Sequence, residues 1–177
     1  MILALAGGVG GAKLANGFAK ILSPDQLLIV VNTGDDFEHF GFPISPDLDT
    51  VTYTLAGLSN TTAGWGLAGE SWKFMNALER LGGEGWFRLG DQDLATHVMR
   101  AAWLSEGQSL SDVTAKITKR LGILHSIVPM SDQQVRTVVE TEAGRMSFQI
   151  YFVREQCGPV IKNIYYEGAT EADPSQA

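Results

Sequence analysis

The N-terminal stretch MILALAGGVGGAKLANGFAKILSPDQLLIVVNTGDD (residues 1–36) decides the fold. An apolar run over residues 2–6 predicts a buried strand, which ends at a pair of glycines. Apolar spacing over residues 11–22 predicts a helix that ends before Pro24, and residues 27–31 form a second apolar run. A strand, a glycine-rich turn, a helix and a strand within about 30 residues make a βαβ unit, whose two strands lie parallel.

Helices and then strands are predicted beyond this unit. Residues 37–49 resemble a loop, and Asp49 is an N-cap candidate for a helix that ends at Gly57. Further helices are predicted over residues 70–81, 94–104 and 109–121, and strands over 123–128, 135–140, 146–153 and 160–166. The pattern predicts an α/β fold, with a Rossmann-like, mostly parallel sheet flanked by helices and extra strands in the C-terminal third. We expect residues 1–170 to form one domain and residues 171–177 a polar, frayed tail.

The composition narrows the class of protein. The net charge is −7, which argues against a protein that coats nucleic acid or an anionic membrane, because both need clustered Lys and Arg. The single cysteine, Cys157, excludes an intrachain disulfide framework and fits a reducing compartment, so we expect a cytoplasmic location. No apolar run reaches the length of a membrane span, and the N-terminus lacks the basic region of a signal peptide.

The glycine-rich turn is the first candidate site. Gly7, Gly8, Gly10 and Gly11 lie between the first strand and its helix, where backbone N–H groups can approach an anion closely. Lys13 adds a positive charge one turn into the helix. The spacing matches neither the Walker motif nor a clean G-x-G-x-x-G. The sequence favours phosphate binding here, and the alternative is a tight turn that only allows the helix to pack on the sheet.

Four carboxylates form the second candidate site. Asp35 and Asp36 follow the second strand, where open α/β sheets bind ligands. Asp47 and Asp49 lie two residues apart, and alternation would aim both acids the same way. Mg²⁺ is usually bound by one or two carboxylates together with phosphate oxygens. The set therefore predicts a metal-assisted phosphate reaction, although Asp49 would serve equally well as a helix cap and Asp36 as the end of a turn.

A third group of residues has weaker signals. Arg88 ends a short apolar stretch, and its side chain is suited to contact a phosphate or ring oxygen. Asp91 and Asp93 precede a predicted helix, so capping explains them. His97 lies one turn into that helix and is more typical of a structural histidine. Trp65, in a glycine-rich loop, is the best tryptophan for stacking on a flat heterocycle.

Five separated motifs carry a family resemblance. They are GGVGGAKL (7–14), VNTGDDF (31–37), ISPDLDTVTYTLAG (44–57), GDQDLATH (90–97) and PMSD (129–132). Together they resemble 2-phospho-L-lactate transferase, the CofD/FbiA family of coenzyme F-420 biosynthesis. The resemblance implies a Rossmann-like fold, a homodimer and Mg²⁺. It also implies transfer of a phospholactyl, phosphoenolpyruvyl or related group from a guanosine diphosphate conjugate to the ribityl hydroxyl of the deazaflavin Fo, with release of GMP.

The resemblance also implies roles for particular residues. Asp49 and Arg88 match positions that contact the deazaflavin, and Asp35 and Asp49 match the acidic metal-site region. The donor diphosphate would lie on the turn of residues 7–11. Either Asp49 or Asp47 would accept the proton of the ribityl hydroxyl.

The length of the chain differs from that of the family, and one other function remains open. Family members are about twice as long, and their later Ser-Asn-Pro and Ser-Ile-Gly-Pro-Ile segments have no match here. We therefore expect the chain to be the N-terminal part of a longer family member. The alternative is a non-catalytic, nucleotide-sugar-binding regulator of the gluconeogenesis-factor type. The motifs ISPDLDT and GDQDLATH favour the transferase.

Overall fold

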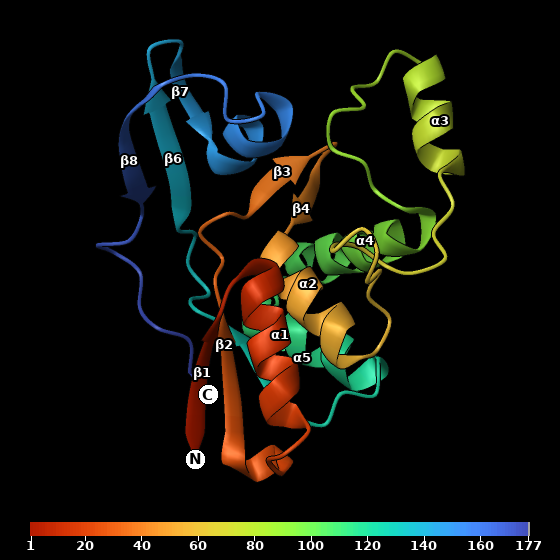
Figure 1. Cartoon of the computed structure of the whole chain (residues 1–177), viewed down its shortest axis with the longest axis vertical. Coiled ribbons are helices and arrows are strands. Elements are labelled where there is room, and N and C mark those ends of the chain that lie inside the picture. The colour runs from red at the N-terminus through yellow and green to blue at the C-terminus, as the bar shows by residue number, and fades with distance from the viewer. Residues whose placement is uncertain (177) are drawn as a thin grey trace.

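A three-stranded parallel sheet forms the base of the structure, a computed structural model that describes residues 1–176 (Figure 1). Its strand order is β1–β2–β5, with β1 at Ile2–Ala6, β2 at Leu27–Val31 and β5 at Ser126–Pro129. The helix α1 (Gly8–Ala19) connects β1 to β2 as the βαβ pattern predicted. Small side chains at Ala4 and Ala6 allow α1 to lie close to the sheet.

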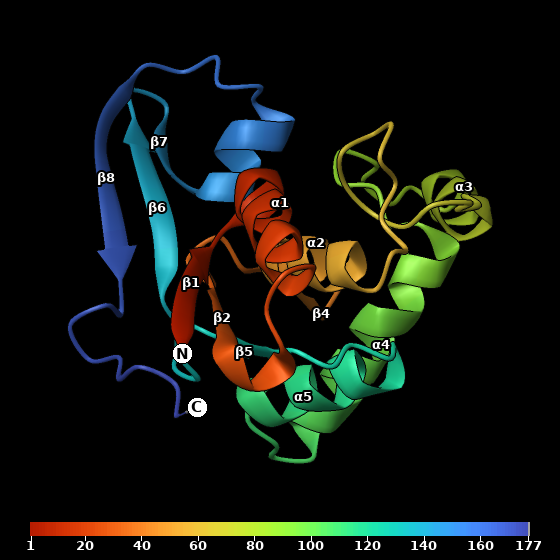
Figure 2. The same ribbon diagram turned by 60° about the horizontal axis from the view of Figure 1, so that its bottom comes forward.

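Four more helices follow the βαβ unit along the chain. They are α2 (Pro46–Leu55), α3 (Lys73–Arg80), α4 (Asp91–Ser105) and α5 (Leu110–Arg120). The helix α2 packs along α1, and α5 packs against β5 (Figure 2). The main core consists of small and branched apolar residues from β1, α1, β2, α2 and β5: Ala4, Ala6, Ala12, Ala15, Leu27, Ile29, Val31, Leu48, Val51 and Ile127. Burial of this surface orients α2 relative to the end of β1.

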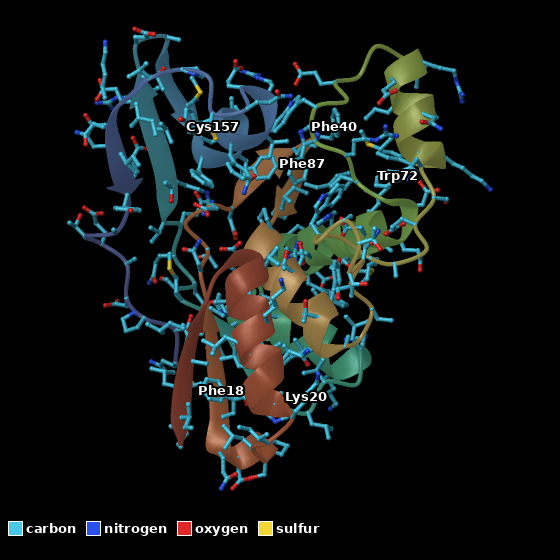
Figure 3. All side chains as sticks on the ribbon, viewed as in Figure 1. Phe18, Lys20, Phe40, Trp72, Phe87 and Cys157 are labelled. Atoms are coloured by element: carbon cyan, nitrogen blue, oxygen red, sulfur yellow. The ribbon has the colours of Figure 1, made fainter. Side chains whose placement is uncertain are left out.

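A short hairpin supports a second apolar cluster. The strands β3 (Phe37–His39) and β4 (Phe42–Ile44) pair antiparallel within the stretch predicted to be a loop. Phe37 contacts Phe87 edge to face, with ring centroids 4.8 Å apart, and Ile44, Met75 and Leu89 are buried beside it. Figure 3 shows the Phe87 side chain close to this hairpin. The hairpin leads directly into α2 and so fixes where that helix begins.

The C-terminal third forms a separate antiparallel sheet in the order β7–β6–β8 (Figure 1). Its strands are β6 (Arg136–Thr141), β7 (Gly144–Ser147) and β8 (Ile161–Glu167), and the π-helix η2 (Ile150–Arg154) follows β7. Val139 and Thr141 are buried on β6, whereas β8 is largely exposed. The first sheet is linked to this one through the loop after β2, because Thr137 N–H donates to the Gly34 carbonyl oxygen.

The predicted fold class is confirmed, with local corrections. The strand predicted over residues 146–153 is wrong beyond Ser147, because a π-helix occupies residues 150–154. The prediction that Asp49 caps its helix is also wrong, because Ser45 is the N-cap and Pro46 occupies the first turn, where a missing N–H costs nothing. Within the predicted polar tail, Ser175 N–H donates to the Met130 carbonyl oxygen, just beyond the end of β5. Among residues 1–176, no helix is both long and apolar enough to cross a membrane.

Candidate active site

The glycine turn joins β1 to α1 and depends on glycine at two places. Gly8 has φ +54°, in the left-handed region that glycine occupies without strain. A Cβ on Gly11 would lie 2.7 Å from Ala6 Cα, so the helix can pass this close to the strand only without a side chain. A Cβ on Gly10 would meet no atom within 4 Å. Gly10 and Lys13 are exposed, so the start of α1 is open to an anion.

Asp47 faces this turn from the first turn of α2. Its Oδ2 lies 3.2 Å from the position that a Cβ on Gly7 would take, and its Oδ1 lies 3.4 Å from that of Gly8. Burial raises the pKa of Asp47, whereas hydrogen bonds from Asn32 and the Gly8 N–H lower it and the charge of Asp35 raises it. A partly buried carboxylate therefore lies beside the predicted phosphate turn.

Asn32 links two of the predicted carboxylates. Its Nδ2 donates to Asp47 Oδ2 at 2.9 Å and lies 3.4 Å from Asp35 Oδ2, while its Oδ1 accepts the N–H of Gly34. Burial raises the pKa of Asp35, and hydrogen bonds from Thr137 and Asn32 oppose that shift. Asn32 was not among the predicted site residues. Its position one residue beyond β2, at the carboxyl end of a parallel strand, was the available signal.

Asp49 lies on a different side of α2 from Asp47, so the expectation that alternation aims them together is wrong. Residues two apart in a helix project about 200° apart, because each residue turns the helix by about 100°. Asp49 is 7% exposed and accepts hydrogen bonds from both Nη atoms of Arg100, one of them at 3.2 Å. The carboxylate of Asp49 is therefore committed to a buried ion pair with α4.

The Asp49–Arg100 pair extends into a buried polar network between α2 and α4. Arg100 Nη1 lies 3.2 Å from His97 Nδ1, and because arginine only donates, Nδ1 accepts and Nε2 carries the proton. His97 Nε2 lies 3.2 Å from Asp93 Oδ2, and the Tyr53 hydroxyl donates to Asp93 Oδ1 at 2.6 Å. One ligand atom each from Asp49, Asp93 and His97 lie within 4.8 Å of one another, so this triad is a second candidate for a metal. Arg100 already supplies the positive charge there.

Asp36 is buried at the junction of the hairpin and the antiparallel sheet. The Ser45 hydroxyl donates to Asp36 Oδ2 at 2.7 Å, and within residues 1–176 Asp36 Oδ1 has no hydrogen-bond partner. Burial raises the pKa of Asp36 to about 7, against lowering contributions from Ser45 and from the charges of Arg100 and Arg136. Asp36 and its neighbour Asp35 therefore lie in different surroundings: Asp36 is buried beside Ser45, whereas Asp35 shares the Asn32 amide with Asp47.

Arg88 lies on an exposed aromatic surface. Its guanidinium carbon is 4.9 Å from the Trp72 ring centroid, a cation–π arrangement, and Trp65 lies 6.4 Å from Trp72 by ring centroids. Trp65 is half exposed, as a stacking residue requires. Asp91 is a capping residue as predicted, but it caps a different helix: its carboxylate accepts an N–H group from the start of α3. The N–H groups at the start of α4 donate to the carboxylate of Glu70 instead.

Known proteins that are similar in sequence to this chain carry the names of transferases. The chain is 40% identical to a "Phosphoenolpyruvate transferase" of Kitasatospora aureofaciens, over 98% of this chain and 56% of that protein. It is 41% identical to a "2-phospho-L-lactate transferase" of Methanospirillum hungatei, over 87% of this chain and 52% of that one. The chain therefore spans about half the length of the curated relatives that it matches.

A solved structure supports the fold, and a family model supports the predicted resemblance. A member of the UPF0052 family from Bacillus halodurans superposes with a TM-score of 0.58 at 16% identity, over 98% of this chain and 53% of that one. The family model described as "2-phospho-L-lactate transferase CofD" matches residues 2–177, essentially the whole chain. The chain belongs to the CofD family of 2-phospho-L-lactate transferases.

Proposed function

We propose that the chain provides the phosphate and metal site of a transferase in coenzyme F-420 biosynthesis. The reaction moves a phospholactyl or phosphoenolpyruvyl group from a guanosine diphosphate conjugate to the deazaflavin Fo, and GMP leaves. The observation that carries the proposal is the Asp35–Asn32–Asp47 cluster beside the glycine turn. The names of the relatives and of the family supply the reaction class.

The donor diphosphate binds at Gly7, Gly8, Gly10 and Gly11, with Lys13 near its outer oxygens. The N–H groups at the start of α1 are free of intrahelical partners, and the helix dipole favours negative charge there. Gly10 has open space in front of it, so a phosphate can approach the backbone. This arrangement binds the diphosphate by its charge and shape.

Mg²⁺ fits the pair Asp35 and Asp47 better than the pair Asp35 and Asp49 expected from the sequence. Asp35 and Asp47 share the Asn32 amide, and within residues 1–176 neither carboxylate forms an ion pair with Lys, Arg or His, so a cation would complete the pair. Asp49 already binds Arg100. When bound, Mg²⁺ neutralises the charge that develops on the transferring and leaving phosphates.

The acceptor reaches this site from the side of the aromatic surface formed by Trp65, Trp72 and Arg88. The deazaflavin stacks there, and its ribityl chain extends toward Asp47. The ribityl oxygen forms the new bond to phosphorus, the bond from phosphorus to the GMP oxygen breaks, and the hydroxyl proton passes to a carboxylate. Asp47 is the proposed proton acceptor, because its carboxylate lies beside the glycine turn where the donor diphosphate would bind. Asp49, held by Arg100, acts as a positioning residue for α2.

Product formation tests this proposal. The chain is incubated with Fo and the guanosine diphosphate-linked donor, and GMP and the Fo conjugate are measured by chromatography. We expect turnover in Mg²⁺ and none in EDTA, and Asp47→Asn should reduce the rate by about 10²-fold or more, the usual contribution of an acid–base group. Asp25→Asn, at an exposed acid beyond the far end of α1, is the matched control. An undiminished rate in EDTA or in Asp47→Asn would contradict the proposed roles of Mg²⁺ and Asp47.

A further inference from the structure

A pocket of about 370 Å³ lies between the start of β3 and one face of the antiparallel sheet. Phe37, Val138 and Met146 form its apolar part. Arg136 from β6 and Arg145 from β7 contribute two guanidinium groups. Figure 1 shows β6 and β7 beside β3 of the hairpin, above the parallel sheet.

The strand register brings the two arginines to the same face. Val138 pairs with Ser147 across β6 and β7, and residues two apart on each strand share a face, so Arg136, Val138, Arg145 and Ser147 point the same way. Thr137, between Arg136 and Val138, points the other way and bonds to Asp35. The same strand therefore contributes to the metal cluster on one face and to this pocket on the other.

Neither arginine has a carboxylate partner. Arg136 is paired across the sheet with Glu167, and Arg145 with Glu140, yet within residues 1–176 only Arg100 and Arg154 form arginine ion pairs. Arg136 Nη1 donates to the Val135 carbonyl oxygen at 2.8 Å. Arg145 lies 4.8 Å above the Tyr165 ring, and Glu140 accepts the Tyr165 hydroxyl instead. Two guanidinium groups at one pocket thus keep unused donors.

The acidic groups of the pocket form no ion pair with these arginines within residues 1–176, although the charge of Arg136 lowers the pKa of Asp36. Asp36 forms the inner wall, is 7% exposed and accepts the Ser45 hydroxyl. Glu167 is exposed, so water screens its charge. The Ser147 hydroxyl oxygen accepts the Ile150 N–H at 3.4 Å, and its proton remains available to a ligand.

We infer that this pocket binds a phosphate group of a small molecule, held by Arg136, Arg145 and Ser147. Guanidinium forks match phosphate oxygens, and two of them suit a dianion. The less polar part of the ligand lies on Phe37 and Val138. This site is separate from the glycine turn and is additional to the donor site proposed above.

A titration with inorganic phosphate tests the inference. Amide chemical shifts of the chain are followed by NMR at constant ionic strength. We expect saturable shifts at Val138 and Ser147, and Arg145→Ala should weaken phosphate at these residues by about ten-fold or more. Arg145 is exposed, so this variant keeps the fold, and Arg136→Gln provides the second variant. Arg80→Ala, an exposed arginine on α3, is the matched control and should bind as the wild type does.

Two further measurements distinguish this site from the glycine turn and from general attraction of anions. Lys13→Ala should change only phosphate shifts at residues 7–11, and it should leave those at Val138 and Ser147 intact. Acetate, a carboxylate monoanion, should bind at Val138 and Ser147 at least about ten-fold more weakly than phosphate. The inference is overturned if Arg145→Ala binds as the wild type does, if shifts occur only at residues 7–11, or if acetate binds as tightly as phosphate.

Discussion

Asn32 is the residue that holds the candidate metal site together. Its side-chain amide serves Asp35 and Asp47 at once, and no second donor side chain links that pair within residues 1–176. Asn32→Ala leaves two partly buried carboxylates without this donor, so the free energy of unfolding should fall by about 1–3 kcal/mol. Urea denaturation measures this loss. Asn76→Ala, at an exposed position of α3, should leave stability nearly unchanged, and equal values for both variants would contradict the bridging role.

Asp36 makes stability depend on pH. Its pKa is raised to about 7 by burial, from an ordinary value of 3.8, so the folded chain holds a proton that the unfolded chain releases between these values. The contribution of Asp36 to the free energy of unfolding is therefore fully present below about pH 4. It falls by roughly 4 kcal/mol as the pH rises to about 7 and is constant above that pH.

Asp36→Asn removes that titration and should flatten this part of the profile. Urea denaturation in EDTA from about pH 4 to about pH 8 gives the difference between the variant and the wild type. Glu171→Gln, at an exposed acid, should keep the wild-type slope. A wild-type slope in Asp36→Asn would show that other groups cause the pH dependence.

At the scale of elements, the close contact of α1 with β1 means that Gly11 and Gly17, both in α1, should respond differently to replacement by alanine. A Cβ on Gly11 would lie 2.7 Å from Ala6 Cα, whereas a Cβ on Gly17 would meet nothing within 4 Å. Gly17→Ala should therefore stabilise the chain by up to about 1 kcal/mol, the ordinary helix preference for alanine. Gly11→Ala should destabilise it by about 1–3 kcal/mol, because the helix must move off the strand. Thermal unfolding compares the two, and equal shifts would contradict the observed approach.

The α2–α4 interface depends on a buried ion pair. Arg100→Ala leaves Asp49 buried without its partner, which should cost about 3–5 kcal/mol of stability. The double variant Asp49→Leu with Arg100→Met should recover much of that loss, since no charge is then left unpaired. Arg80→Ala provides the exposed control. If Mg²⁺ restored the melting temperature of Arg100→Ala to that of the wild type, Asp49 would be a metal ligand after all.

The sequence predicted the βαβ unit because its signals are local: an apolar run, glycines, helical spacing and a second apolar run. The register between α2 and the glycine turn could not be predicted, because it depends on where the helix starts. Placing that start at Pro46 instead of after Asp49 separates Asp47 from Asp49 and pairs Asp49 with Arg100, a residue 51 positions away. The β3–β4 hairpin was missed because its strands are only three residues long, one of them containing Pro43.

For the whole molecule, the structure brings some of the predicted site residues together and separates others. Residues 7–11, Asp35 and Asp47 come together, although they lie on three separate segments. Asp49 and Arg88 are placed apart from that cluster, Asp49 in a buried ion pair and Arg88 over the ring of the partly buried Trp72. Contact of these two residues with the deazaflavin, the homodimer and the cytoplasmic location stay predictions.

Binding of GDP with and without Mg²⁺ tests the central claim, that the glycine turn and the Asp35–Asp47 pair bind the donor diphosphate with a metal. Isothermal titration calorimetry should give at least about ten-fold tighter binding in Mg²⁺ than in EDTA. Gly10→Val should abolish binding without loss of fold, because its side chain enters open space, while Gly17→Val on the same helix should bind normally. Equal affinity in EDTA, or wild-type affinity in a folded Gly10→Val chain, would contradict the claim.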